Sequence, residues 1–547
     1  MTASQPKWFT PLRLLGIFCL TNLVVYLDRG LIASNGVNGS PRTEENPSGT
    51  GIQGDFNLSY FADGLLPAIF MVGLLLSSPV FAEAVKHCSA FRMLGWGMAV
   101  WSAAVVACGA APNFGCLLAA RAFVGVGEAS FVALAAPFID DFAPAAQKTR
   151  WFAAFYLCIP VGFAAGYIFG GLVSAVTTWR WAFVCEGLAM VPFVVFVLTA
   201  QPLSLKGSEP AGARRVSAVG KREKGHHRSQ HYDRRSWRDV VREFLADVAT
   251  VCRQRVWVSV CIAYTAYVAV LGVYAYWGPK AGRALFFGAD DSGGSADLVF
   301  GGVTVITGVV GSVAGGLALD KMGSTLRNAN LLCGVSTLAG CCFLLLAFTT
   351  SRTFAAFMGV FALGQLVIFL LQAPVAATGM WCVPPELRPL GASLTTVSIH
   401  LLGDVPSPPL VGLLQTRLAA GKDPGQAAQQ WRISLSVCTL LLLLSGGMFL
   451  LAAAQSGPGS DFRDQPPQPQ QVGRAGEGGG GEEEGGEGCG SGIGRRGSGC
   501  GEGVRGVAVG VGGGEGEGGL DGRPLLGERE GRVSSSSRFS GVEDLSE

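Results

Sequence analysis

Twelve apolar segments, each about twenty residues long or longer, constrain the fold of this chain more than any other feature. A segment of this length can cross a bilayer as an α-helix, which bonds its backbone polar groups internally. The segments cover residues 11–34, 60–83, 91–111, 114–137, 149–175, 179–200, 256–279, 297–319, 329–350, 352–378, 389–415 and 432–454. Charged residues make up only 15% of the 547 residues, against about 25% in ordinary soluble domains. The sequence therefore predicts an all-α, multi-pass membrane protein.

A polar break in the middle of the chain divides these segments into two sets of six. We therefore expect a six-helix bundle at 1–200, a cytoplasmic linker at 201–255, a second six-helix bundle at 256–455 and a tail at 456–547. The tail is rich in Gly and Glu and almost lacks large apolar side chains. It cannot bury enough surface to fold, and we predict that it is disordered.

The linker has two features that suit a cytoplasmic membrane surface. It is strongly basic, which favours an anionic leaflet. The basic residues are Arg214, Arg215, Lys221, Arg222, Lys224, Arg234 and Arg235. Between Trp237 and Val248 apolar residues recur at helical spacing among charged ones, which predicts an amphipathic interfacial helix.

The charges of the short loops predict the orientation of the helices, because cytoplasmic loops collect Lys and Arg. Basic residues occur in the loops after the second, fourth, eighth and tenth segments, whereas the turns near 112 and 177 carry no charge. A cytoplasmic N-terminus follows from this distribution. Four basic residues count against a clean asymmetry, namely Lys280, Arg283, Arg352 and Arg417.

Four ionisable residues inside the first and fourth segments are the main candidates for a functional site: Asp28, Arg29, Arg121 and Glu128. An ionisable group within a membrane span costs about 2.5–3.5 kcal/mol, so it usually faces a bundle interior or a cavity. With the predicted orientation, Asp28 and Arg121 lie at similar depths and can pair. Glu128 then lies nearer the bilayer midplane, with Arg29 as a more distant candidate partner.

The formal charges of this quartet sum to zero, so protonation of one carboxylate would free an arginine for a solute or for another conformation. Proton coupling works in this way, and Glu128 is the strongest single candidate for the proton site. The alternative is a static set of ion pairs that only fixes helix packing.

In the second half, His400 and Asp404 are four residues apart and share a helix face. Pro406, Pro408 and Pro409 follow and must interrupt the regular helical hydrogen bonds. The pair is a candidate for gating, with simple packing as the alternative. Glycine runs at 162–171 and 308–316 predict close helix packing. The alternative is that they form surfaces along which the two bundles rock against one another.

These residues give the chain a resemblance to the spinster-like transporters of the major facilitator superfamily. The resemblance covers about 15–455 and rests on five motifs. They are Tyr26-Leu-Asp-Arg29, Arg121-Ala-Phe-Val-Gly-Val-Gly-Glu-Ala129, Ile159-Pro-Val-Gly162, Phe300-Gly-Gly-Val-Thr304 and His400-Leu-Leu-Gly-Asp404. The stretches 32–40 and 51–57 are most similar to plant and algal members.

The resemblance implies a major facilitator fold that moves lipid-like solutes such as sphingolipids or lysophospholipids. It also implies a late endosomal, lysosomal or vacuolar membrane, with the plasma membrane as the alternative, and proton coupling in some members. The charged quartet matches positions that the family uses for coupling or gating.

Two departures from the family pattern matter. The inner-gate loop motif is intact after the eighth segment, where it includes Asp320 and Lys321, but its first-half counterpart at 82–87 has no acid at the Asp position. In addition, Gln365 stands where relatives often have Glu. Coupling is therefore expected to depend mainly on the first half.

We expect secondary transport of an amphipathic lipid by alternating access around a midplane site. Arg29 and Arg121 would bind the head group, with Lys280 and Arg283 as weaker candidates. The lipid tails would lie along aromatic side chains, with a core role as the alternative for these residues. The aromatic residues are Tyr264, Tyr267 and Tyr274.

Two other functions stay open, a carrier of a small polar or anionic metabolite and a non-transporting membrane sensor or scaffold. No nucleophile–base pair or metal-ligand spacing occurs, so we expect no enzyme, cofactor, metal or nucleic-acid partner. In the tail, Asp521, Leu525 and Leu526 fit an acidic dileucine pattern that sorting adaptors read, with a chance match as the alternative.

Overall fold

The computed structural model describes residues 6, 8–42, 47–85, 88–144, 147–203, 237–287, 294–457 and 459–463. They all belong to one compact unit, Met1–Pro469. The basic part of the predicted linker before 237, the predicted tail beyond 463 and the candidate sorting residues Asp521, Leu525 and Leu526 lie outside the described residues.

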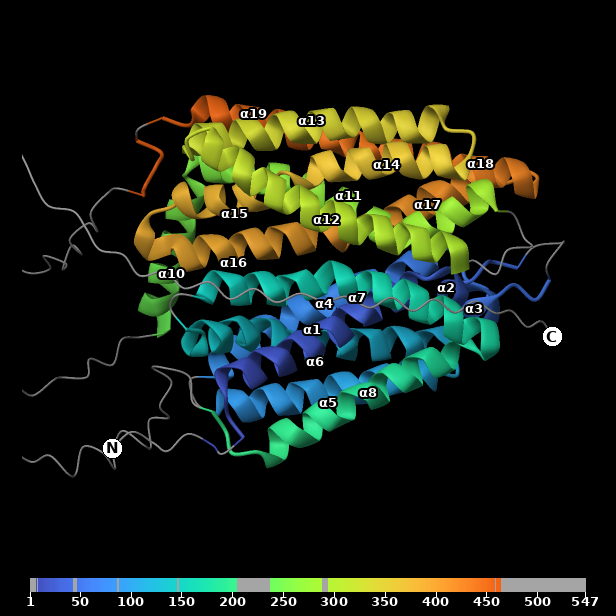
Figure 1. Cartoon of the computed structure of the whole chain (residues 1–547), viewed down its shortest axis with the longest axis horizontal. Coiled ribbons are helices and arrows are strands. Elements are labelled where there is room, and N and C mark those ends of the chain that lie inside the picture. The colour runs from blue at the N-terminus through green and yellow to red at the C-terminus, as the bar shows by residue number, and fades with distance from the viewer. Residues whose placement is uncertain are drawn as a thin grey trace, which may run out of the picture. The chain divides into compact units, whose positions relative to one another are not determined.

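Six long helices form the first bundle, and two short helices, α2 and α3, follow the first of them. The bundle comprises α1 (Pro11–Ala33), α4 (Tyr60–Ala84), α5 (Ala90–Gly109), α6 (Phe114–Phe142), α7 (Lys148–Val176) and α8 (Trp179–Thr199), and the short helices are α2 (Asn35–Asn38) and α3 (Gly51–Asp55). In Figure 1 this bundle occupies the lower half of the view.

The second bundle, in the upper half of Figure 1, contains the remaining spans. Its elements are α11 (Arg255–Phe286), α12 (Gly294–Lys321), α13 (Leu326–Thr350), α14 (Phe354–Phe369), α15 (Gln372–Trp381), the 3₁₀ turn η2 (Pro385–Leu387), α16 (Arg388–Ser398), the π-helical turn η3 (Ile399–Asp404), α17 (Ser407–Ala419), α18 (Pro424–Thr439) and α19 (Leu441–Gln455). Among the described residues, twelve helical spans are long and apolar enough to cross a membrane. The predicted count is confirmed.

Prolines divide two of the spans in the second bundle. Pro374 has no N–H to donate to the carbonyl of Leu370, and the helix breaks there between α14 and α15. Near Pro406, Pro408 and Pro409 the helix widens into η3, where the Val405 N–H donates to the His400 carbonyl five residues earlier. The predicted interruption at these prolines is confirmed.

Glycines allow the helices of the first bundle to approach closely. A Cβ on Gly125 of α6 would lie 2.0 Å from the Phe70 carbonyl oxygen of α4, and one on Gly166 of α7 would lie 2.2 Å from the Leu27 oxygen of α1. In the second bundle, a Cβ on Gly315 of α12 would lie 1.9 Å from the Leu370 oxygen. The predicted packing role of the glycine runs is confirmed at Gly166 and Gly315, and Gly125 adds a close approach outside these runs.

The amphipathic helix predicted before the second bundle is present as α10 (Trp237–Cys252). Its side chains Val241, Phe244 and Leu245 are each more than 40% exposed. An exposed apolar face of this kind suits the membrane interface. Figure 1 shows α10 at one end of the bundles and α2 and α3 at the other. We name these the inner and outer ends, following the orientation that the loop charges predict.

Candidate functional site

Two buried ion pairs form the centre of the candidate site, and both lie within the first bundle. Arg121 Nη1 on α6 donates to Asp28 Oδ1 on α1 at 2.7 Å, and both side chains are at most 1% exposed. Arg29 Nη2 donates to Glu128 Oε1 at 2.5 Å, and Arg29 keeps 14% exposure. The predicted Asp28–Arg121 pair is confirmed. Glu128 and Arg29 also form a direct pair, closer than the sequence predicts.

An aromatic ring of α4 contacts both guanidinium groups. The Phe70 ring centroid lies 4.9 Å from Arg29 and 5.4 Å from Arg121, and the Tyr26 ring lies 4.7 Å from Arg29. Such cation–π contacts are worth about 0.5–2 kcal/mol each. Phe70 is not among the predicted site residues, because one Phe in an apolar segment carries no signal of its own.

Each member of the quartet keeps one polar atom without a hydrogen-bond partner among the described residues. These atoms are Asp28 Oδ2, Arg29 Nε, Arg121 Nε and Glu128 Oε2. Buried polar atoms without partners are uncommon and cost about 1–3 kcal/mol or more when charged. The site therefore has bonding capacity left for a solute, a proton or a different pairing.

A fifth ionisable residue, Glu186 of α8, belongs to the same cluster. Its side chain is 3% exposed, and it interacts electrostatically with Asp28, Arg121 and Glu128. Glu186 is absent from the predicted site residues, although the rule that selects ionisable groups inside apolar segments applies to it as well.

The second bundle contributes a carboxylate near this cluster. His400 Nδ1 lies 3.1 Å from Asp404 Oδ2, which confirms that the two residues share a helix face. Asp404 interacts electrostatically with Arg29 of the first bundle. The π-helical turn η3, which also contacts α4, therefore places the pair beside the site.

A buried polar network, which we call the outer cluster, joins the two bundles at their outer end. It consists of Asn35, Asn38, Gln53, Asp63, Tyr276, Lys280 and Asp297. Lys280 Nζ of α11 donates to Asn38 Oδ1, to Gln53 Oε1 at 2.5 Å and to Asp63 Oδ2 at 3.2 Å. Tyr276 also donates to Asp63, at 2.8 Å. Lys280 thus ties α11 to α2, α3 and α4.

A second contact of the outer cluster holds α12. The Asn35 backbone N–H donates to Asp297 Oδ2 at 2.9 Å, and its side-chain amide donates to Asp297 Oδ1 at 2.6 Å. Tyr167 OH of α7 adds a bond to the Ala275 carbonyl at 2.6 Å. Within the described residues, the hydrogen bonds between the two bundles lie in this outer half. The conformation is therefore closed at the outer end.

The structure changes the interpretation of two predicted substrate contacts. Lys280 is 7% exposed and bonded within the outer cluster, so it is not free for a head group in this conformation. Tyr267 is fully buried and donates to the Ile368 carbonyl, which favours the alternative core role in this conformation, and its contact with lipid tails stays a prediction. The sequence around Lys280 or Tyr267 does not reveal which helices cover these side chains. Tyr264 is half-buried and stacks on Tyr267, and its contact with substrate stays a prediction.

The structure also locates the intact inner-gate loop of the second bundle and Gln365, which stands where relatives often have Glu. Asp320 and Lys321 of the inner-gate loop are exposed, and Asp320 accepts a hydrogen bond from Ser324 at 3.1 Å. Gln365 is buried, and its Oε1 lies 3.4 Å from the Thr307 hydroxyl that donates to it. Gln365, which stands where relatives often have Glu, is therefore a neutral hydrogen-bonding group inside the second bundle.

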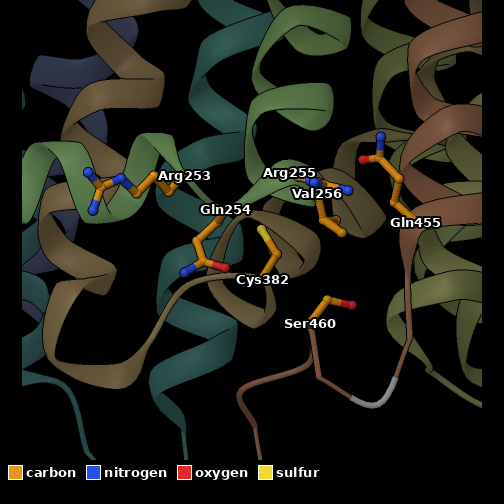
Figure 2. Close-up of a pocket in the computed structure, with 7 residues that line it drawn as sticks. All are labelled: Arg253, Gln254, Arg255, Val256, Cys382, Gln455 and Ser460. Carbon is orange, nitrogen blue, oxygen red and sulfur yellow. The ribbon is translucent and has the colours of Figure 1, made fainter.

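A separate cavity of about 340 Å³ lies at the inner end of the second bundle. Figure 2 shows its lining, which combines the junction between α10 and α11 with residues near the ends of α15 and α19. The lining residues are Arg253, Gln254, Arg255, Val256, Cys382, Gln455 and Ser460. Burial raises the pKa of the Cys382 thiol to about 12, so this sulfur is a poor nucleophile near neutral pH. None of the charged quartet lines this cavity.

Comparisons with known proteins agree with this architecture. The family model for the Major Facilitator Superfamily matches residues 18–408. The chain is 44% identical over 458 residues to the probable sphingolipid transporter spinster homolog 2 of Arabidopsis thaliana, which covers 82% of this chain and 89% of that protein. It is 29% identical to the human protein spinster homolog 3, over 80% of this chain and 82% of that protein.

Among solved structures, the chain is similar to a bacterial homologue of the human lysosomal transporter spinster, crystallised in an inward-facing and occupied conformation. The TM-score is 0.64 with 16% sequence identity, and the match covers 83% of this chain and all of that one. At this identity the likeness concerns the fold.

Proposed function

The chain belongs to the spinster-like transporters of the major facilitator superfamily, and from this we propose that it moves an amphipathic lipid across a membrane by alternating access. The substrate class is a sphingolipid or a lysophospholipid. The single observation that carries the proposal for this chain is the buried quartet of two ion pairs with unsatisfied atoms, next to the bundle interface. The sphingolipid named for the Arabidopsis relatives supports the choice of substrate.

Arg29 is the residue that we assign to the head group. It alone among the quartet keeps measurable exposure, 14%, and its Nε has no partner among the described residues. A phosphate or other anionic group could therefore bond to Arg29 and compete with Glu128. Arg121 is at most 1% exposed and paired with Asp28 in the interior, so it would serve a later conformation.

Proton coupling is the second part of the proposal. A head group that takes Arg29 away leaves Glu128 as a buried carboxylate without a cation, which is strongly unfavourable. Uptake of a proton by Glu128 removes that charge. Substrate and proton binding would thus favour one another, as linkage requires, and His400 and Asp404 would sense the change from the second bundle.

The outer cluster serves as the outer gate. In the closed conformation it buries Lys280 and Asp63 together and bonds α11 and α12 to α2, α3 and α4. Opening would hydrate these groups and separate the bundles at this end. The inner-gate loop with Asp320 and Lys321 would act at the opposite end, where both residues are exposed now.

The proposed location is a late endosomal, lysosomal or vacuolar membrane, and candidate tail residues Asp521, Leu525 and Leu526 would recruit sorting adaptors. Imaging of the tagged full chain tests this. An Asp521→Ala, Leu525→Ala, Leu526→Ala variant should move to the plasma membrane, and an unchanged internal location would contradict the role of the motif.

The test of function is uptake into proteoliposomes that contain the full chain. The substrates are a sphingoid base, its phosphate, a lysophospholipid, a hexose and a nucleoside. Uptake of lipids alone supports the proposal, and uptake of the hexose or nucleoside alone would make the chain a metabolite carrier. Lack of uptake of every substrate, with correctly folded protein, would favour a sensor or scaffold.

A matched pair of variants ties uptake to the site. Arg29→Ala should abolish lipid uptake, whereas Arg327→Ala removes an equal charge from an exposed position and should leave it unchanged. Equal uptake by Arg29→Ala and wild type would refute the assignment of the head group.

A further inference from the structure

Glu186 is a buried carboxyl group that the proposed function does not yet use. It lies on α8, is 3% exposed, and neither of its two side-chain oxygens has a hydrogen-bond partner among the described residues. Most buried polar atoms in proteins are bonded, so a carboxyl with two unbonded oxygens requires an explanation.

The charged and titratable groups around Glu186 come from three helices. Asp28 belongs to α1, Cys108 to α5, and Arg121 and Glu128 to α6. Arg121 interacts electrostatically with Cys108 and Glu186 as well as with its partner Asp28, so the same guanidinium faces both carboxyl groups. Helices α7 and α2, which also contact α8, bring no further charged group to Glu186 in the described part of the chain.

A count of charges restricts the state of Glu186. The two arginines and two carboxylates of the quartet sum to zero, and an ionised Glu186 would leave the buried cluster at −1. An uncompensated buried ion costs several kcal/mol, and here no hydrogen bond would offset it. A neutral Glu186 restores a net charge of zero.

We propose that Glu186 is a third proton-carrying carboxyl of this site, protonated in the outer-closed conformation, and the alternative partner of Arg121. The exchange step conserves charge and protons. The O–H bond of Glu186 breaks and an O–H bond forms on Asp28 Oδ2, the oxygen without a hydrogen-bond partner among the described residues. Arg121 then leaves the neutral Asp28 and pairs with the Glu186 carboxylate, for which its unbonded Nε is available.

This exchange would give the transporter two pairings of equal net charge. Arg121 joins α6 to α1 in the present state and would join α6 to α8 in the other. Because α1 carries Asp28 and Arg29 side by side, release of Asp28 would also loosen the neighbouring Arg29–Glu128 pair. The inference about coupling rests on the proposed transport function, whereas the protonation of Glu186 does not.

The direct test is pH-difference infrared spectroscopy of the full chain in lipid nanodiscs. The spectrum should contain a carbonyl band from a neutral carboxyl that is lost in Glu186→Gln. Glu186→Asp should shift this band rather than remove it. This variant therefore still tests the proposal if Glu186→Gln folds poorly. Glu386→Gln, which removes an exposed carboxyl, is the control and should keep the band. An unchanged band in both Glu186 variants would overturn the proposal.

Flux in proteoliposomes tests the role in coupling separately. A pH gradient of one unit can drive at most about tenfold accumulation through one coupled proton. Glu186→Gln should reduce this ratio to about one while lipid exchange without a gradient continues, and Glu186→Asp should restore part of it. A loss of the infrared band with full gradient-driven accumulation would make Glu186 a protonated structural residue and refute its coupling role.

Discussion

Replacement of Lys280 by Met should open the outer gate. Lys280 donates to Asn38, Gln53 and Asp63, and Asp63 is fully buried. The variant keeps a long unbranched side chain but removes the cation, so Asp63 remains as a buried carboxylate whose other hydrogen bonds, among the described residues, come from Asn38 and Tyr276. Removal of one partner from a buried ion pair costs about 3–5 kcal/mol.

This cost falls mainly on the closed state, because opening hydrates Asp63. At about 1.4 kcal/mol for each factor of ten, the ratio of open to closed molecules should rise by roughly 10²- to 10⁴-fold. Pulsed electron paramagnetic resonance can measure this with spin-label amino acids at Val176 and Lys422, two exposed residues at the outer end of different bundles. A longer distance should appear or grow in Lys280→Met.

The double variant Lys280→Met, Asp63→Asn separates charge from packing. It removes the stranded carboxylate, so it should return most molecules to the closed distance. Arg327→Met, which removes an exposed cation, serves as the control and should behave as wild type. The reasoning fails if Lys280→Met gives the wild-type distances, or if the double variant is as open as the single one.

Three other variants test the site and its packing. Glu128→Gln should abolish the pH dependence of lipid uptake while the protein still folds, and uptake driven by a pH gradient at the wild-type level would exclude Glu128 as the coupling residue. Phe70→Leu removes two cation–π contacts of about 0.5–2 kcal/mol each, so the apparent affinity for lipid should fall by at least about twofold in uptake titrations; an unchanged affinity would contradict a role of the ring. Gly125→Val should lower the thermal stability in detergent sharply, because even a Cβ would lie 2.0 Å from the Phe70 carbonyl oxygen; a wild-type melting temperature would show that α4 and α6 can separate at no cost.

The site was only partly predictable from the sequence. The Asp28–Arg121 pair could be inferred, because two residues at similar depths on predicted spans have few other partners. Glu186 could have been found by the same rule, since it is an ionisable residue in an apolar segment. Phe70 could not, because only the tertiary packing of α4 brings its ring to the arginines of α1 and α6.

The outer cluster illustrates a different limit. Lys280 and Asp63 lie 217 residues apart in the chain, and the short helices α2 and α3 that supply Asn38 and Gln53 carry no hydrophobic pattern strong enough to place them. A basic residue near the end of an apolar segment ordinarily suggests contact with lipid phosphates. Its burial depends on which segments fold over it.

The twelve spans, their division into two sets of six and the buried quartet were determined by the sequence alone. Their signal is local, since the thickness of the bilayer sets the length of an apolar segment and the cost of a charge inside it. Only the tertiary structure decided that Arg29 bonds directly to Glu128, that Lys280 closes the outer end and that Tyr267 lies in the core. These contacts depend on how helices distant in sequence cross, and on glycines that let their backbones approach, which hydropathy along the chain does not record.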